Sequence, residues 1–203
     1  MTRVKICGIT RLDDAKLAES LGAHALGFIF YKESKRFITP ANAKNIIKNL
    51  TPFIIKVGVF VNEDPNIIES IRDFCGLDRI QIFYDDKNMY KSLDPSIYIP
   101  VFKIKTESDI KEAIKLQHLI LFDTYHQGLH GGTGQTFDWN LLKSVTKPYI
   151  LAGGINNDNI LDALKYKPFA IDVASGLESS YGIKDRKKMF EFFKKIRENQ
   201  VYL

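Results

Sequence analysis

Short apolar runs alternate with amphipathic segments along the whole chain, and this alternation constrains the fold more than any other feature of the sequence. The runs are rich in β-branched residues and mostly lack polar–apolar alternation, which is typical of strands buried on both faces of a parallel sheet. We predict strands at Val4–Cys7, Ala25–Phe30, Ile54–Val61, Arg79–Phe83, Ile97–Ile104, Leu119–Phe122, Tyr149–Ala152 and Ala170–Ala174.

The segments between these runs carry helical patterns. Leu12–Leu21, for example, gathers its apolar residues on one helical face. The other predicted helices are Ala41–Leu50, Pro65–Phe74, Asp86–Leu93 (the weakest pattern), Ser108–Leu116, Trp139–Ser144, Asp158–Leu164 and Asp185–Arg197. Strand and helix alternate about eight times, roughly every 25 residues, which predicts a (β/α)8 TIM barrel. Without any linker, residues 1–203 are expected to form a single domain, with an open doubly wound sheet as the alternative.

Composition and charge exclude several classes of protein. The net charge is +5, but the lysines are scattered and no basic run is interleaved with aromatic residues, so nucleic acid is not an expected partner. No apolar run approaches the roughly 20 residues that span a bilayer. The N-terminal sequence MTRVKICGIT lacks the apolar stretch of a secretory signal. We therefore expect a cytoplasmic protein that does not associate with membranes.

Two residues at predicted strand ends are candidates for chemistry, because barrel active sites lie at the C-terminal ends of the strands. Cys7 ends the first strand, and Asp123 directly follows the sixth. Each also has a structural interpretation: a buried cysteine is most often a small hydrophobic residue, and an aspartate here can cap a loop. The other cysteine, Cys75, precedes Gly76 at a helix end and is interpreted as packing. Two cysteines make neither a disulfide framework nor a zinc site.

Small residues follow the seventh and eighth strands. LAGGIN (Leu151–Asn156) contains two adjacent glycines, and VASG (Val173–Gly176) ends in Ser175 and Gly176. Small residues let backbone N–H groups approach a phosphate closely, and these two loops are common phosphate sites in barrels. The alternative is ordinary turn chemistry. We predict a phosphate site here.

Three further features lie in the loops. Arg36, in the segment KESKRF, carries a guanidinium that suits a carboxylate, although a solvated charge cluster explains it equally well. The Gly-rich segment Thr124–Phe137 is long enough for an active-site lid but matches neither the Rossmann nor the Walker pattern. The four histidines, of which His126 and His130 lie in this segment, show no metal-binding spacing, so no metal site is predicted.

Six motifs together resemble the phosphoribosylanthranilate isomerase family of tryptophan biosynthesis. They are KICGIT (Lys5–Thr10), SKRF (Ser34–Phe37), VGVFVN (Val57–Asn62), DTYHQGLHGGTGQTFDW (Asp123–Trp139), LAGGIN (Leu151–Asn156) and DVASGLE (Asp172–Glu178). The resemblance covers nearly the whole chain. It implies that Cys7 is the general base, that Asp123 is the general acid and that Arg36 holds the anthranilate carboxylate.

The resemblance also implies the remaining substrate-binding residues. They are Gly154, Ser175 and Gly176 at the phosphate, together with Gly153, Asp172 and Gln81. The chain departs from the family after the fourth strand, where Gln81-Ile82-Phe83-Tyr84 stands in place of a sequence close to QLHG. The substrate contacts of that loop are therefore in doubt.

The implied reaction is an Amadori rearrangement of a small phosphorylated substrate, which needs no cofactor and no metal. It requires an acid whose pKa is raised by a low-dielectric site. A modest depression of the thiol pKa from its usual value of about 8.5 would give a useful thiolate population at neutral pH. Lys5 and Arg3 share the strand of Cys7, but the sequence does not place them at the thiol. We expect a monomer rather than a homodimer.

Two other functions remain open at this point. The related aminoaldose isomerase of histidine biosynthesis, or a bifunctional isomerase, performs the same chemistry, but that family pairs aspartates at strands one and six, and Cys7 argues against it. A non-catalytic sensor of phosphorylated ligands would keep the loops after strands seven and eight but would have no use for Cys7 together with Asp123.

Overall fold

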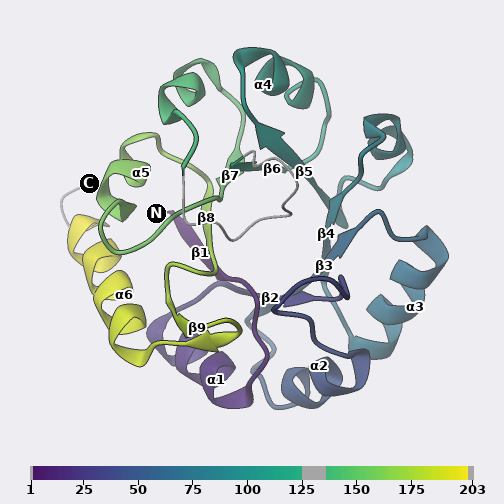
Figure 1. Cartoon of the computed structure of the whole chain (residues 1–203), viewed down its shortest axis with the longest axis vertical. Coiled ribbons are helices and arrows are strands. Elements are labelled where there is room, and N and C mark those ends of the chain that lie inside the picture. The colour runs from purple at the N-terminus through teal and green to yellow at the C-terminus, as the bar shows by residue number, and fades with distance from the viewer. Residues whose placement is uncertain (1, 125–135, 201–203) are drawn as a thin grey trace.

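The computed structural model describes residues 2–124 and 136–200, which form a closed parallel barrel inside a ring of helices (Figure 1). The barrel strands are β1 (Arg3–Ile6), β2 (Ala25–Ile29), β3 (Ile55–Val61), β4 (Arg79–Phe83), β5 (Tyr98–Ile104), β6 (Ile120–Thr124), β7 (Tyr149–Leu151) and β8 (Ala170–Val173). Each pairs in parallel with the next, and β8 pairs with β1 to close the ring. The predicted (β/α)8 barrel is confirmed, and the open-sheet alternative is wrong.

The outer ring contains α-helices and two 3₁₀ helices. They are α1 (Leu12–Leu21), α2 (Pro40–Ile47), α3 (Pro65–Cys75), the 3₁₀ helix η1 (Lys87–Ser92), α4 (Glu107–Ala113), the 3₁₀ helix η2 (Trp139–Ser144), α5 (Ile160–Lys165) and α6 (Arg186–Gln200). The segment with the weakest helical pattern became η1. All eight predicted helical segments are therefore helical, although two of them are tighter and shorter than α-helices.

Local sequence explains where α2 and α3 begin. Thr39 and Asp64 each accept a hydrogen bond from a backbone N–H of the first helical turn, and each precedes a proline. Proline is favoured at the first helical position because its missing N–H would have no partner there. The cap and the proline together fix the start of each helix.

Apolar side chains form two cores. The larger lies between the sheet and the helices and includes Leu26, Phe28 and Phe60. The smaller fills the barrel and consists of Ile99, Val101, Leu121, Ile150, Ala152 and Ala170. Because side chains alternate along a strand, the neighbouring inward positions toward the C-terminal ends bring polar groups into the barrel. Those polar groups form the candidate site.

An antiparallel hairpin of β9 (Glu178–Ser180) and β10 (Ile183–Lys184) follows β8 and was not predicted. Lys184 ties it to the barrel, because its Nζ donates to the carbonyl oxygens of Cys7 at 2.7 Å and Ala174 at 3.1 Å. The hairpin therefore joins the C-terminal ends of β1 and β8.

Across residues 2–124 and 136–200, no helix has both the length and the apolar character needed to cross a membrane.

Candidate active site

A cavity of about 120 Å³ opens at the C-terminal ends of the barrel strands. Nearly all of the site residues predicted from the sequence line it: Cys7, Arg36, Gln81, Asp123, Gly153, Gly154, Asp172 and Ser175. The barrel thus brings together side chains from six of its strands or the loops that follow them. Gly176 packs directly behind this lining.

Cys7 lies at the end of β1 with its thiol directed into the cavity. It is 6% exposed, and its backbone N–H donates to the carbonyl of Val173 at 2.8 Å. Burial raises the pKa of the Cys7 thiol, and the charge of Asp172 raises it further, while Lys5 and Lys184 oppose the rise. The pKa of the Cys7 thiol is therefore raised rather than modestly depressed.

Lys5 is the site residue that sequence reasoning missed. Its Nζ donates to Asp172 Oδ2 and to Gln81 Oε1, each at 2.8 Å, and its charge acts on the neighbouring Cys7 thiol. Burial alone would lower the pKa of Lys5, but Asp172 and Cys7 together raise it. Strand periodicity was the available signal, because residues two apart on one strand share a face.

Asp123 lies across the cavity on β6. Burial raises its pKa to about 6, and the hydrogen bond from the Thr124 N–H, at 2.8 Å, opposes the rise. Asp172 adds to the rise, whereas Lys103 and Lys5 also reduce it. A carboxyl group with this pKa keeps an appreciable protonated fraction near neutral pH, as an acid catalyst requires.

Gly153, which follows β7, allows the close approach of Asp123. A Cβ at this position would lie 2.6 Å from the Thr124 nitrogen and 2.7 Å from Asp123 Oδ1. Its φ of 85° is also in the left-handed region, which favours glycine. The glycine is therefore required both by its backbone conformation and by the position of Asp123.

Arg36 is buried rather than part of a solvated cluster. Its Nε and Nη2 donate to both carboxylate oxygens of Glu178 at 2.8 to 3.1 Å, and Glu178 also accepts from Lys184 Nζ at 3.0 Å. Burial would raise the pKa of Glu178, but these two cations hold it below its usual range. Within the described residues, Nη1 of Arg36 makes no hydrogen bond, so it remains available to a ligand in the cavity.

The loops after β7 and β8 lie side by side. An isolated parallel bridge joins Asn156 to Gly176, and a Cβ on Gly176 would lie only 2.0 Å from the carbonyl oxygen of Ile155. Gly154 and Ser175 present their backbone to the cavity. The two loops predicted to bind phosphate therefore form one continuous wall made of small residues.

Asp172 and Gln81 both accept hydrogen bonds from Lys5 Nζ, as described above. The other carboxylate oxygen of Asp172, Oδ1, is buried and has no hydrogen-bond partner within the described part of the chain. An unpaired buried carboxylate oxygen is costly, so it marks a position where a ligand hydroxyl would be stabilising.

Phe83 and Tyr84, the two residues at which the chain departs from the family's usual sequence, do not line the cavity. Phe83 packs against the apolar core inside the barrel, and its ring lies under Lys103 Nζ at 4.5 Å. Tyr84 is buried among the outer residues, and its N–H donates to the Tyr90 hydroxyl. Neither residue contacts Cys7 or Asp123 in any interaction that the described residues make.

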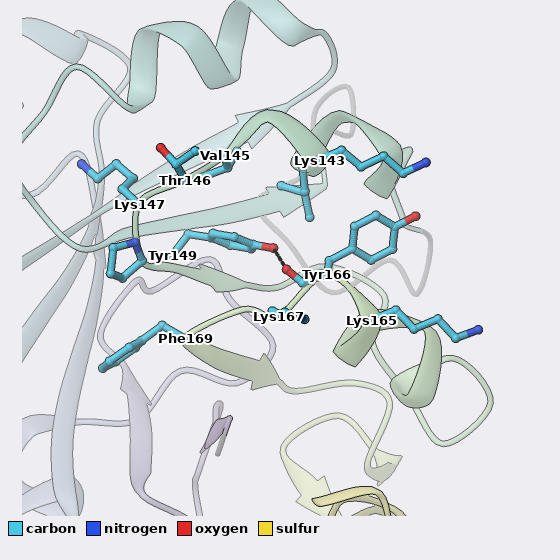
Figure 2. A pocket seen from close by; sticks show the side chains of 11 residues that line it. Lys143, Val145, Thr146, Lys147, Tyr149, Lys165, Tyr166, Lys167 and Phe169 are labelled. Atoms are coloured by element: carbon cyan, nitrogen blue, oxygen red, sulfur yellow. Dashed lines mark hydrogen bonds between the residues drawn. The ribbon is translucent and has the colours of Figure 1, made fainter. Parts of the chain in front are cut away.

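A larger hollow of about 740 Å³ lies at the opposite end of the barrel, before β7 and β8. Lysines and apolar residues line it, and its described lining contains no carboxylate and no thiol. Figure 2 shows that Lys147 points away from Lys143 and Lys165, so their amino groups do not converge on a ligand. Lys147 and Lys165 are also engaged with Leu116 and Asp162. Its described lining therefore has no thiol–carboxyl pair like the one in the cavity at the other end.

The long segment between β6 and η2, with His126 and His130, falls almost entirely outside the described residues. Within the described residues, no cluster of His, Cys, Asp and Glu could hold a metal ion.

Comparison with known proteins gives a consistent result. The family model of N-(5'phosphoribosyl)anthranilate (PRA) isomerase matches residues 4–195. The N-(5'-phosphoribosyl)anthranilate isomerase of Bacillus cereus (strain B4264) is 43% identical over 97% of this chain and 98% of its own length.

Solved structures agree. Phosphoribosyl anthranilate isomerase from Thermotoga maritima superposes with a TM-score of 0.89 at 36% identity, covering 98% of this chain and all of the other. A phosphoribosyl anthranilate isomerase in complex with reduced 1-(o-carboxyphenylamino)-1-deoxyribulose 5-phosphate gives 0.86 at 35% identity over the same shares. A further structure describes the Thermotoga maritima protein as dimeric (33% identity, TM-score 0.85, 97% and 99% coverage). Motifs, barrel and site geometry agree with these matches, and the chain belongs to the N-(5'-phosphoribosyl)anthranilate isomerase family.

Proposed function

We propose that this enzyme converts N-(5'-phosphoribosyl)anthranilate into 1-(2-carboxyphenylamino)-1-deoxyribulose 5-phosphate, in tryptophan biosynthesis, with Cys7 as general base and Asp123 as general acid. One observation carries the assignment of roles. A thiol on β1 and a carboxyl group on β6 line the same cavity, beside a wall of small residues suited to a phosphate.

The first step opens the ribose ring. Asp123 donates its proton to the ring oxygen as the bond from that oxygen to C1′ breaks, and the nitrogen lone pair forms a protonated imine with C1′. The elevated pKa of Asp123, about 6, keeps the required proton available. The imine acidifies the proton on C2′.

The second step removes that proton. The Cys7 thiolate takes it and becomes a thiol, while the C–H electron pair forms a C1′–C2′ double bond and the imine electrons return to nitrogen. The resulting enolamine tautomerises to the ketone. No hydride moves and the imine is the electron sink, so the chemistry requires neither a cofactor nor a metal.

The remaining cavity residues would hold the substrate at both ends. Gly153, Gly154, Ser175 and Gly176 suit the phosphate, because their backbone can approach it closely. Arg36, oriented by Glu178, would bind the anthranilate carboxylate through Nη1. Fixing both ends aligns the sugar between acid and base, and positioning of this kind lowers the barrier substantially.

Asp172 and Gln81 complete the proposed binding site. The unpaired Oδ1 of Asp172 would accept a hydrogen bond from a sugar hydroxyl. Gln81 would act less directly, by supporting Lys5 at the base of the cavity. The substrate is thus enclosed by groups from opposite walls of the barrel.

Single substitutions test the two catalytic roles. Cys7→Ala and Asp123→Asn should each reduce kcat by about 10²-fold or more while the protein remains folded, because each removes a proton-transfer group. The measurement follows the fluorescence of freshly prepared N-(5'-phosphoribosyl)anthranilate as it is consumed. Cys75→Ala is the matched control, because Cys75 lies on α3, does not line the cavity, and donates to the Pro40 carbonyl. Near-normal turnover in a folded Cys7 or Asp123 variant would overturn the assigned role.

A monomeric state and a cytoplasmic location are also part of the proposal. Both cysteines are free, which suits a reducing compartment. The Thermotoga maritima relative is dimeric, so a dimer is the alternative for this chain. Light scattering of the purified protein decides between them, and a dimer mass would contradict the expected monomer.

A further inference from the structure

Lys5 and Cys7 share the inward face of β1. Lys5 is only 4% exposed, although its side chain carries a charge. An ammonium group has three donors. Two are directed to Asp172 Oδ2 and Gln81 Oε1, each at 2.8 Å. These two partners, on β8 and β4, hold the ammonium group in the part of the barrel that also contains the Cys7 sulfur.

Gly27 on β2 shows how closely the two groups are packed. A Cβ at this position would lie 2.7 Å from Cys7 Sγ and 3.0 Å from Lys5 Nζ. The backbone of Gly27 is not in the left-handed region, so its conformation does not require glycine. A side chain is excluded here because the Cys7 sulfur and the Lys5 ammonium group already occupy the space. β2 therefore leaves room for the thiol and the ammonium group beside each other.

The charged groups around Cys7 have distinct positions. Asp172, on β8, disfavours a thiolate, and Lys184, on β10, favours it. Lys184, however, directs its Nζ to the backbone oxygen of Cys7 and to Glu178 rather than to sulfur. Arg36 and Asp123 line the same cavity, but Arg36 is paired with Glu178. Of the two lysines that favour the thiolate, Lys5 has the larger effect on the pKa of Cys7.

We propose that Lys5 is a positioning residue for the reaction, a permanently charged ammonium that stabilises the thiolate of Cys7 and is fixed in place by Asp172 and Gln81. The inference rests on the proposed role of Cys7 as the base. In the proton balance, Cys7 gains the C2′ proton and later loses it, whereas Lys5 stays protonated throughout. Burial without such a cation would leave the thiol too weakly ionised to act as a base.

The direct test replaces Lys5 by methionine, which keeps the length and removes the charge. The titration of Cys7 is followed by thiolate absorbance in the ultraviolet, with Cys75→Ala in the background so that one thiol remains. The midpoint should move upward in Lys5→Met, and each pH unit of movement leaves about tenfold less thiolate at neutral pH. kcat should fall in proportion, with a smaller change in KM, and should partly recover at high pH.

Lys103→Met is the matched control. Lys103 also lies inside the barrel, on β5, but is near Asp123 rather than Cys7. The same substitution there should leave the Cys7 midpoint unchanged. An equal shift in both variants would overturn the proposal, because it would show a general effect of charge inside the barrel. An unchanged midpoint in folded Lys5→Met would overturn it as well.

A reciprocal measurement covers the case in which Lys5→Met does not fold. Coupling between two groups acts equally in both directions. In Cys7→Ala, the titration of Lys5 Nζ, observed by NMR, should therefore move to lower pH than in the wild type. An unchanged Lys5 titration would contradict the proposal. The two hypotheses can be refuted separately. An active Cys7→Ala variant refutes the role of Cys7 as general base. An inactive Cys7→Ala variant with no coupling between Cys7 and Lys5 refutes only the role of Lys5.

Discussion

Burial raises the pKa values of the two proposed catalytic residues, Asp123 and Cys7, and this has opposite consequences for their roles. Burial favours the neutral form of both Asp123 and Cys7. For Asp123 this supplies the proton that the reaction needs, whereas for Cys7 it opposes the ionised form that the reaction needs. The same low-dielectric cavity therefore helps one catalytic group and hinders the other, and cations are required only beside the thiol.

The raised pKa values of Asp123 and Cys7 together predict the pH profile of kcat/KM. Below about pH 6, Asp123 is protonated and the Cys7 thiolate fraction falls about tenfold per pH unit, so activity falls with pH. Between the two pKa values, growing thiolate is offset by the loss of protonated Asp123, which gives a plateau. Above the raised pKa of Cys7, activity falls again. Steady-state kinetics from about pH 5 to 10 check this shape.

A control separates the enzyme from its substrate, because a phosphate ester also titrates near pH 6. In Asp123→Glu the acidic limb should move if Asp123 causes it and should stay if the phosphate does. A profile that rises continuously through neutral pH, without a plateau, would contradict the assigned protonation states.

Residue-level reasoning from the sequence placed most of the site correctly within one cavity, for an identifiable reason. Strand ends in a parallel barrel converge, so Cys7 and Asp123 could be placed together although 116 residues separate them along the chain. Lys5 could also have been placed, since it precedes Cys7 by two positions. The pairing of Arg36 with Glu178 could not, because it depends on a loop and a hairpin that meet only in the folded chain.

At the scale of elements, the ends of β6 and β7 are packed against each other through Gly153. Its φ is positive, and a Cβ would meet the Thr124 backbone and the Asp123 carboxylate. The position of the acid therefore depends on the absence of a side chain on the neighbouring strand end.

Gly153→Ala should accordingly reduce both stability and turnover. We expect a loss of roughly 3 kcal/mol in the free energy of unfolding, from left-handed strain together with overpacking, and a kcat at least about tenfold lower. Urea denaturation and steady-state kinetics measure the two effects. Gly22→Ala is the control, because Gly22 has a φ of 97° but open space around it. It should show only the strain, about 1 to 2 kcal/mol, with kcat unchanged. Equal effects of the two substitutions would contradict the steric argument.

Element boundaries followed from the sequence wherever hydrophobic pattern or capping decides them. α1 has the predicted bounds, and the strands differ from the predictions by at most two residues at either end. The β9–β10 hairpin was missed because its strands are two or three residues long and mostly polar, so they carry no apolar period. Its position depends on Lys184 and Glu178, whose partners are distant in sequence.

At the scale of the whole molecule, stability and catalysis depend on different regions. The larger core between sheet and helices contains none of the proposed catalytic and substrate-binding residues, which instead lie at one end of the barrel interior. α6 shows this separation clearly, because it packs on the outside of the barrel (Figure 1). Its Phe192 is fully buried, and its Phe190 is 44% exposed.

Phe192→Ala should therefore lower the free energy of unfolding by about 4 kcal/mol, because it leaves a large cavity in the core. kcat should stay near the wild-type value at temperatures where the variant is folded. Phe190→Ala on the same helix should cost less than about 1 kcal/mol. Thermal or urea unfolding compares the two, and similar losses would refute the burial argument. A large fall in kcat for folded Phe192→Ala would show that the outer core also governs catalysis.

The amino group of Lys184, which joins the carbonyl ends of Cys7 and Ala174, also sets a limit on when the enzyme can first work during its synthesis. The ribosome makes the proposed base 177 residues before its backbone anchor. Glu178, which orients Arg36, also follows the last barrel strand. A nascent chain that has completed all eight barrel strands still lacks the groups that fix Cys7 and Arg36. Catalytic competence is therefore acquired only after the β9–β10 hairpin has been made.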